Sequence, residues 1–143
     1  MEKRADPLHR QLCFALDSAN NAMGRLYRPM LNELGLTYPQ YLVLLALWEQ
    51  DHQTVSMLGK ALYLESNTLT PLLKRMEGSD LVRRVRSLED ERSVSVSLTE
   101  TGKSLEEKAH DIGICVTNVA GKDGLDVAAF RDELLKLAER LRS

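Results

Sequence analysis

The two cysteines, Cys13 and Cys115, are the residues of this chain best suited to covalent chemistry. A cysteine is a nucleophile as the thiolate, and an unperturbed thiol is mostly protonated at neutral pH. The two residues lie far apart in the sequence, and a permanent structural disulfide is not expected in a compartment that keeps thiols reduced. The two thiols are therefore either inert core residues or redox-active groups.

Other common reactive sites are missing from the sequence. His9, His52 and His110 are scattered, so no cluster of histidines and cysteines has the spacing of metal ligands. There is no phosphate-binding glycine loop and no nucleophile elbow. A chain of 143 residues can bury a core but is short for an enzyme with its own substrate domain. These features favour a binding role over catalysis, and we expect no cofactor and no metal site.

Residues 55–98, here called the reading region, have the pattern of two short helices followed by a β-hairpin. Apolar residues recur at helical spacing in two runs, which are Val55, Leu58, Ala61 and Leu62, then Leu69, Leu72, Leu73 and Met76. Only residues 63–65 separate the runs, so the two helices must cross steeply. Serines then alternate with apolar residues over 93–98, which predicts a strand with one buried face, and 82–86 is its expected partner. This pattern is typical of a winged helix-turn-helix, whose second helix enters the major groove of DNA.

Charge is distributed unevenly along the chain. The formal net charge is −2, which argues against a protein that coats nucleic acid or an anionic membrane by bulk charge. From Lys74 to Arg86, however, five residues are basic and two are acidic. A local positive excess suits a site-specific DNA-binding protein, because phosphates are neutralised where the reading elements lie. On charge alone, an ordinary solvated surface of mixed charge is an open alternative.

The sequence before the reading region predicts two helices. An apolar stripe at steps of three and four residues indicates a long first helix that is broken near Pro29. The stripe consists of Leu12, Leu16, Ala19, Met23, Leu26 and Met30. Thr37 and Gln40 then fit a capping box, which opens a very apolar and therefore buried helix that runs through Trp48.

The sequence after the hairpin predicts further helices. Thr99 and Glu100 start one that ends or bends near Gly113 or Gly121. The last segment has an apolar seam suited to packing against other helices, formed by Val127, Phe130, Leu134, Leu137 and Leu141. These apolar faces exceed what one reading region can cover, so we expect a symmetric dimer. The alternative is that the terminal helices pack only on their own reading region.

The domain organisation is expected to be simple. There is no run of 18 apolar residues, and residues 1–7 lack the apolar centre of a signal peptide, so we expect a cytoplasmic protein that does not enter a membrane. No internal repeat, low-complexity tract or long linker is present. We expect a single domain over 1–143, mainly α with a small β-wing. Within it, a winged helix-turn-helix at about 53–100 is flanked by dimerisation helices at about 7–32 and 101–143.

This order of elements resembles the multiple antibiotic resistance regulator (MarR) family over essentially the whole chain. Two motifs match that family's wing and the exit from the wing, Asp90-Glu91-Arg92-Ser93 and Leu98-Thr99-Glu100-Thr101-Gly102. Segments 11–16, 36–42 and 69–77 are more specific. They look like the organic hydroperoxide resistance regulator branch of the family.

The resemblance implies a role for Cys13. In that branch a cysteine near the start of the first helix senses peroxide, and Cys13 stands at that position. Two tyrosines that hydrogen-bond its sulfur in the family match Tyr27 and Tyr38. Tyr27 lies roughly 21 Å from Cys13 along one straight helix and cannot reach it. If the family pairing holds, one tyrosine comes from the other subunit, or a sharp bend occurs near Pro29.

The resemblance also makes Cys115 the candidate resolving thiol. Oxidation of Cys13 gives a sulfenic acid, which condenses readily with a second thiol. Cys115 lies about one helical turn earlier than in members with two cysteines, so resolution by a free small thiol stays open. A disulfide between the two positions requires Cα atoms within about 7 Å, so a helix would have to shift or unwind. Such a movement would rotate the paired reading regions and release DNA.

Residues that contact DNA can be suggested by element. Short polar side chains at the leading end of the second reading helix can touch base edges or phosphate, namely Ser66, Asn67, Thr68 and Thr70. Whether this helix begins at Ser66 or Thr70 is open by one turn. Basic candidates for phosphate are Lys74 and Arg75, followed on the strand by Arg83, Arg84 and Arg86. Arg92 resembles the family's wing arginine, which enters the minor groove, and Asp90 is expected to orient it.

Together these expectations describe a dimeric repressor that releases a near-palindromic operator in double-stranded DNA when an organic hydroperoxide oxidises Cys13. One alternative is a related repressor released by a non-covalently bound phenolic or other small ligand. A second alternative is a thiol peroxidase that turns over, but no recycling motif supports it. We therefore expect a protein that is not an enzyme.

Overall fold

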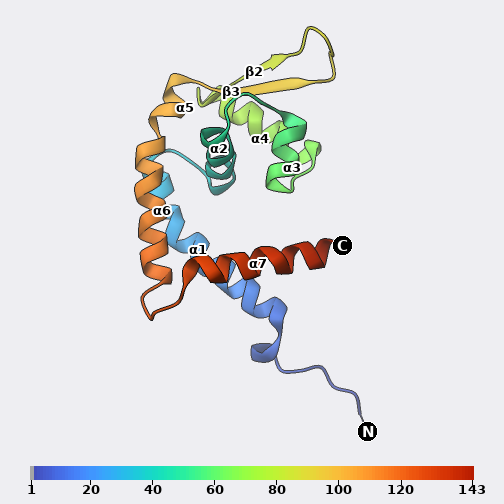
Figure 1. Ribbon diagram of the computed structural model, residues 1–143, viewed down its shortest axis with the longest axis vertical. Coiled ribbons are helices and arrows are strands. Elements are labelled where there is room, and N and C mark those ends of the chain that lie inside the picture. The colour runs from blue at the N-terminus through green and yellow to red at the C-terminus, as the bar shows by residue number, and fades with distance from the viewer. Residues whose placement is uncertain (1) are drawn as a thin grey trace. The chain divides into compact units, whose positions relative to one another are not determined.

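The computed structural model describes residues 2–143 and consists mainly of helices with one small antiparallel sheet (Figure 1). This arrangement confirms the predicted fold class. The chain divides into two compact units, of which the first reaches to Lys108 and the second is Ala109–Ser143. Within residues 2–143, no helix is both long enough and apolar enough to cross a membrane. Over the same residues, no group of three or more His, Cys, Asp or Glu side chains could hold a metal ion.

The elements follow one another closely along the chain. The first unit contains a 3-10 turn (Leu8–Arg10), α1 (Leu12–Glu33), α2 (Tyr38–Glu49), β1 (Gln53–Thr54), α3 (Val55–Leu62), α4 (Ser66–Gly78), β2 (Val82–Arg86), β3 (Val94–Leu98) and α5 (Glu100–Ser104). Helix α6 (Glu106–Ala120) begins at the end of that unit, and α7 (Val127–Arg142) follows in the second.

Helix α1 runs unbroken from Leu12 to Glu33 with Pro29 inside it, so the predicted break near Pro29 is wrong. Proline removes one helical hydrogen bond, which frees the carbonyl of Arg25 four residues earlier. Arg25 and Pro29 are both exposed, so water can bind that carbonyl and the helix continues. The helix ends instead at Glu33, and the positive φ of 71° at Gly35 lets Leu36 N–H donate to the Leu31 carbonyl.

Helix α2 begins with the predicted capping box. The Gln40 backbone N–H donates to Thr37 Oγ1 at 3.3 Å, and the Thr37 N–H donates to Gln40 Oε1 at 3.1 Å. The helix is apolar around most of its circumference and fills the centre of the first unit, with Tyr41, Val43, Leu44 and Leu47 buried. This burial confirms its predicted place in the core.

Helices α3 and α4 form the predicted helix-turn-helix, with only residues 63–65 between them. Tyr63 adopts the left-handed conformation with φ 56°, and Leu64 N–H donates to the Gly59 carbonyl at 2.9 Å. A side chain on Gly59 would press on the Leu64 carbonyl, so a glycine permits this tight turn. Helix α4 begins at Ser66, which settles the open question of its start.

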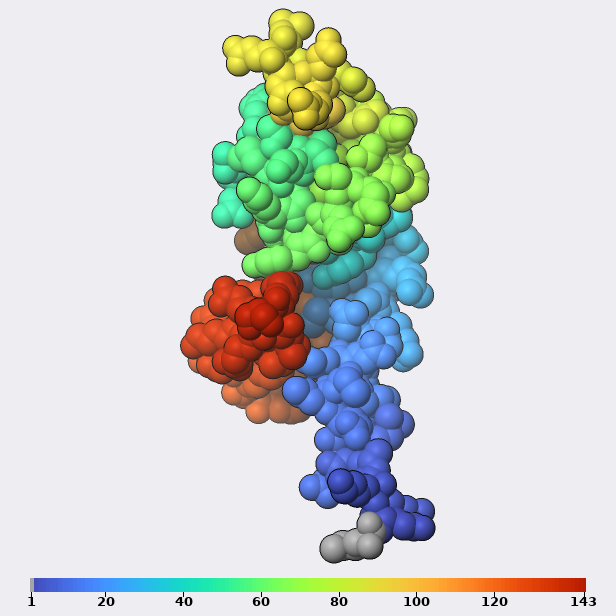
Figure 2. All heavy atoms as spheres, turned by 90° about the vertical axis from the view of Figure 1, so that its right-hand side faces the viewer, coloured from blue at the N-terminus to red at the C-terminus, as the bar shows by residue number. Residues whose placement is uncertain are grey.

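The wing consists of β2, β3 and the loop between them. The predicted pairing is confirmed, with Val82 opposite Leu98, Arg84 opposite Val96 and Arg86 opposite Val94. A short strand that the alternation pattern did not reveal, β1, pairs with the other edge of β3 and places Gln53 opposite Val96. The hairpin projects beyond α3 and α4, as the yellow atoms above the green ones in Figure 2 show.

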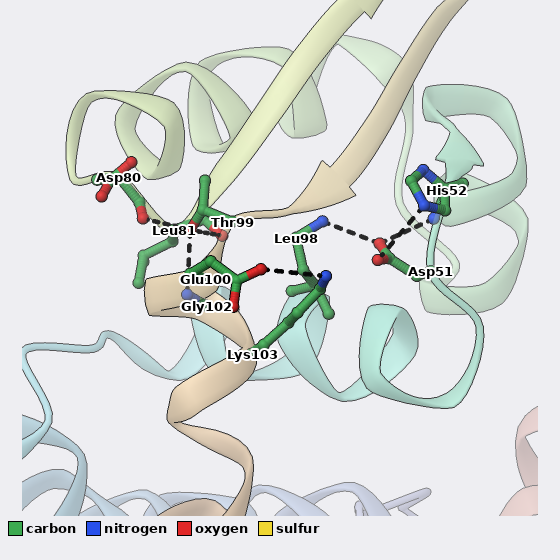
Figure 3. A network of polar contacts seen from close by, with 9 residues as sticks. All are labelled: Asp51, His52, Asp80, Leu81, Leu98, Thr99, Glu100, Gly102 and Lys103. Carbon is green, nitrogen blue, oxygen red and sulfur yellow. Dashed lines mark hydrogen bonds and ion pairs between the residues drawn. The ribbon is translucent and has the colours of Figure 1, made fainter.

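The chain leaves the wing through α5, which Thr99 caps as predicted. Thr99 Oγ1 accepts from Gly102 N–H at 3.1 Å and donates to the carbonyl of Asp80 at 2.6 Å (Figure 3). The helix does not continue to Gly113, because it is interrupted at Leu105. Ser104 Oγ donates to the Thr101 carbonyl, the acceptor that Leu105 N–H would use in a continuous helix.

Of the two positions predicted for the end or bend of this segment, Gly113 is wrong, because it lies inside α6. The other predicted end is close to the observed one, because α6 stops at Ala120, directly before Gly121. The last predicted helix is present as α7, and its apolar seam is partly exposed in the single chain, with Phe130 at 50% and Leu141 at 69%.

Gly102 should tolerate no side chain. A Cβ at this position would collide with the carbonyl oxygen of Leu81, which is backbone and cannot move aside. We expect Gly102→Ala to lower the free energy of unfolding by about 1–3 kcal/mol, measured by urea denaturation. Gly78→Ala is the matched control, because nothing lies within 4 Å of a Cβ there. Equal stability of the two variants would contradict the packing described for α5.

Candidate functional site

Cys13 is the second residue of α1 and is exposed. It borders a shallow hollow with Leu8, Phe14 and Leu16, which gives the thiol an apolar approach. The first turn of a helix has backbone N–H groups without helical partners, and the helix dipole stabilises negative charge there. This placement suits a reacting thiol.

Three tyrosines from two helices form a cluster in the first unit. Tyr27 on α1 has its ring centroid 5.5 Å from that of Tyr38 and 5.6 Å from that of Tyr41, both on α2. Tyr41 is buried, whereas 42% of Tyr38 is exposed. The structure thus brings the two predicted tyrosines together and adds Tyr41, which sequence reasoning missed. The spacing of Tyr41 from Tyr38 could have revealed it, because residues three apart on a helix share a face.

The cluster raises the pKa of two of its phenols, those of Tyr27 and Tyr41. Burial, followed by the neighbouring Tyr41 and Tyr38, raises the pKa of Tyr27 to about 12. Burial likewise raises the pKa of Tyr41. A phenol with such a raised pKa is neutral at physiological pH and can donate its O–H to an anion. The cluster is therefore a site of hydrogen-bond donors.

A groove of about 440 Å³ runs beside the cluster. Tyr27 and Tyr38 both line it, together with apolar Met23 and Leu31. Arg28 is the one charged side chain among its lining residues. The groove offers space next to the phenols for a thiol, a small organic molecule or both.

Cys13 cannot reach Tyr27 within its own chain. Cys13 and Tyr27 lie fourteen residues apart on one uninterrupted helix, which corresponds to about 21 Å. The absence of a break near Pro29 removes the second explanation for the predicted pairing. A Cys13 thiol that meets Tyr27 must therefore come from another molecule.

Cys115, the second predicted thiol, lies on α6 in the second compact unit. It is free and exposed, as is Cys13. Ile112, one turn earlier, and Val116, the next residue, are buried, so Cys115 lies at the exposed border of the packed face of α6. An exposed thiol is open to chemical attack.

The leading end of α4 presents the predicted polar residues. Ser66, Asn67 and Thr68 are exposed, and Thr70 is half-buried. A hollow of about 380 Å³ lies between this end of α4, the start of α3 and the wing, and it is lined by residues that include Ser66, Thr70, Asp90 and Arg92. Several predicted side chains from distant parts of the sequence therefore border one hollow. Lys74 and Arg75 are exposed further along α4.

The wing loop is held in shape by its own short polar residues. Ser87 N–H donates to the Ser93 carbonyl at 2.8 Å, and Ser87 Oγ accepts from Glu89 N–H at 3.2 Å. Asp90 Oδ1 accepts from the backbone N–H of Arg92 at 3.1 Å. Asp90 thus orients the backbone of Arg92 and leaves the guanidinium exposed.

Arg84 differs from the other strand arginines because it is tied to α4. Its backbone N–H donates to Glu77 Oε2 at 2.9 Å, and its guanidinium donates to Oε1 at 3.1 and 3.3 Å. The backbone N–H of Arg84, and then its guanidinium, lower the pKa of the Glu77 carboxyl. The pair fastens the end of α4 to β2, whereas Arg83 and Arg86 are exposed.

The chain is similar to known transcriptional regulators over most of its length. Residues 25–109 match the family described as transcriptional regulator SarA/Rot. The organic hydroperoxide resistance transcriptional regulator of Bacillus subtilis (strain 168) is 48% identical over 143 residues, which cover 99% of this chain and 97% of that protein. Reduced AbfR bound to DNA, from Staphylococcus epidermidis, is 35% identical with a TM-score of 0.78, covering 95% of this chain and 96% of its own. Disulfide-formed AbfR is 37% identical with a TM-score of 0.69, covering 94% and 91%.

The raised pKa of Tyr27 predicts a loss of stability at high pH. The folded chain holds the phenolic proton more tightly than the unfolded chain, so the contribution is complete below pH 10.0 and is lost as the pH rises towards about 12. We expect Tyr27→Phe to make the decline in unfolding free energy over this range shallower, measured by urea denaturation at each pH. Tyr63→Phe, outside the cluster, is the control. Identical declines in wild type and Tyr27→Phe would contradict the assignment.

Proposed function

Because the chain belongs to the MarR family of transcriptional regulators, in its organic hydroperoxide resistance branch, we propose that it is a dimeric repressor that releases operator DNA when an organic hydroperoxide oxidises Cys13. The observation that carries this proposal is that the thiol and the tyrosines expected to bind it lie far apart within one chain. The donor tyrosines meet in one chain, and the thiol lies about four helical turns away on the same helix.

A symmetric dimer reunites these parts twice. In a two-fold arrangement, the contact that Cys13 makes with the partner's groove is repeated by the partner's thiol with this chain's groove. The exposed apolar residues of α1, including Leu12 and Phe14, give the thiol end of that helix a surface to bury. We assign the N-terminal helix and the helices after the wing to dimerisation on this basis.

The proposed reaction is a two-electron oxidation of one sulfur. Phenolic O–H groups of Tyr27 and Tyr38 donate to the Cys13 thiolate and stabilise its charge. The thiolate attacks the distal peroxide oxygen, the O–O bond breaks, and the hydroperoxide leaves as an alcohol after taking up a proton. The sulfur becomes a sulfenic acid. The apolar side chains beside Cys13, Leu8 and Phe14, favour an organic peroxide over hydrogen peroxide.

The sulfenic acid is then proposed to react with a thiol. Attack by the Cys115 thiol forms a disulfide and releases water, and a free small thiol would give a mixed disulfide by the same chemistry. The existence of a disulfide-formed state in AbfR, a relative with 37% identity, supports the first route. A bond to Cys115 would pull on α6, because disulfide geometry demands Cα atoms within about 7 Å.

DNA binding is assigned to α4 and the wing. Ser66, Asn67 and Thr68 are proposed to read base edges or hold phosphate, and Arg92 to enter the minor groove. Lys74, Arg75 and Arg86 would neutralise phosphate, as would Arg83. Arg84, held by Glu77, would act by fixing the angle between α4 and the wing. Such a protein acts on DNA in the cytoplasm and is not an enzyme, since each oxidation is used once as a signal.

A second candidate function rests on the groove beside the tyrosines. Its volume of about 440 Å³ and mixed apolar and polar lining would also accept a small phenolic ligand without thiol chemistry. In that case release of DNA would not depend on Cys13.

The direct test compares operator binding before and after peroxide. Cumene hydroperoxide should weaken binding by the wild type at least about tenfold, within the range of allosteric coupling energies, and leave Cys13→Ser unchanged. The measurement is fluorescence anisotropy with a labelled operator duplex. Release of Cys13→Ser by the peroxide would reject the sensor assignment, and release by a phenol alone would favour the second candidate.

Cys115→Ser separates the two routes of resolution. Non-reducing electrophoresis after peroxide should show a species of doubled mass in the wild type that is lost in Cys115→Ser. A monomer that gains the mass of an added small thiol, in both proteins, would exclude Cys115 as the resolving thiol. His110→Gln, an exposed substitution on the same helix, controls for general effects on α6.

A further inference from the structure

Helix α2 has one end in the tyrosine cluster. Tyr38 is its first residue, and Tyr41 lies one turn further along. Both rings contact Tyr27, at centroid distances of 5.5 and 5.6 Å. A change of bonding or position at the phenols therefore acts directly on the start of α2.

The other end of α2 is fastened to the elements that carry the wing. Trp48 Nε1 donates to the Gly102 carbonyl in α5 at 3.0 Å. Gln53, buried in β1, donates through Nε2 to the carbonyls of Ala46 at 3.0 Å and Gln50 at 2.7 Å. These bonds join the last turn of α2 to one strand of the sheet and to the exit helix.

Asp51, just after α2, adds a bond to the wing strand itself. Its Oδ1 accepts from the backbone N–H of Leu98 at 2.9 Å, and Figure 3 shows the carboxylate pointing at that nitrogen. Strand β1 pairs only with Ser95 and Val96 of β3, so it does not reach Leu98. The Asp51 carboxylate takes the place of a strand at the end of β3.

Between these ends, α2 is suited to move as a rigid rod. It spans twelve residues, or about 18 Å, without an internal glycine, and its only proline stands in the first turn. The capping box closes its first turn, and its middle residues Val43, Leu44 and Leu47 are buried. A buried and fully bonded helix shifts or rotates more readily than it bends.

We propose that Trp48 and Asp51 are positioning residues that make the wing and α5 follow α2. Oxidation of a Cys13 thiol bound at the tyrosine cluster then changes the position of the DNA-reading hairpin. The inference rests on the proposed function, because it assumes that Cys13 oxidation acts at Tyr27 and Tyr38. It adds the route within one chain, from the phenols through α2 to β3 and α5. The bonds of Trp48 and Asp51 are the last contacts on that route.

Trp48 reports on its own bond, because it is the only tryptophan in the chain. If α5 follows α2, the indole N–H keeps the Gly102 carbonyl as its acceptor in both redox forms. We expect the tryptophan emission of operator-free wild type to keep its wavelength after peroxide, because the indole stays bonded and sheltered from water. A shift to longer wavelength in fully oxidised wild type would show that the bond breaks, and would overturn the proposal.

Trp48→Phe tests whether the bond carries the signal. Phenylalanine keeps an aromatic ring in place and removes the donor. We expect the ratio of operator Kd in the oxidised form to that in the reduced form to fall about fivefold, the effect of losing one hydrogen bond. Asp51→Asn should lower the same ratio, since a neutral amide accepts the Leu98 N–H more weakly. Glu49→Gln, an exposed change next to Trp48, is the matched control.

A purely structural role would give another result. Trp48→Phe and Asp51→Asn would then lower Tm and weaken operator binding of both redox forms equally, with the ratio unchanged, and this outcome rejects the proposal. If Trp48→Phe does not fold, two measurements still test the proposal. These are the tryptophan emission of the wild type and the ratio of oxidised to reduced operator Kd for Asp51→Asn. Failure of peroxide to release the wild type rejects the proposed function instead, so the two failures are distinguishable.

Discussion

The unbroken helix α1 is the constraint on which the rest of the structure depends. It carries Cys13 in its first turn and Tyr27 fourteen residues later, and an α-helix of that length holds them about 21 Å apart. Because Tyr27 packs on Tyr38 and Tyr41, the donor groups are fixed to α2 and cannot move towards the thiol of their own chain. The sensor that we propose from these residues therefore requires two chains. In that proposal, sensing and dimerisation are one property, and a change at the sulfur acts on the relation between two reading regions.

Helix α2 connects the tyrosine cluster to the elements that carry the wing. Helix α2 begins in the tyrosine cluster and ends at bonds to α5, β1 and β3. The other side of the reading region is fixed by Glu77 and Arg84, which join α4 to β2. The wing and α4 are thus braced against each other, while the route from the phenols enters through α2. A rigid reading region moved as one body suits a repressor, since site-specific binding by a dimer depends on the spacing of its two recognition helices.

Much of this fold could be predicted from the sequence, because burial imposes periods that are visible in it. The two helices of the reading region, the paired strands and the capping box at Thr37 follow from such patterns and are confirmed. Strand β1 could not be found this way, since two residues show no period. The helix break at Leu105 depends on Ser104 competing for a single carbonyl, and the tolerance of Pro29 depends on which side of α1 faces water. Tyr41 and the Glu77–Arg84 pair join residues whose contact is set by tertiary packing, which local patterns do not contain.

Mixed dimers test the central claim that thiol and phenols come from different chains. One chain carries Cys13→Ser and the other Tyr27→Phe with Tyr38→Phe, so each parent homodimer lacks one half of every sensor. The mixed dimer has one complete pair only if Cys13 of one chain meets the tyrosines of its partner. The account predicts that its single Cys13 is oxidised by cumene hydroperoxide at a rate close to that of a wild-type site, measured by thiol loss. Reactivity no higher than that of the double-tyrosine homodimer would contradict it.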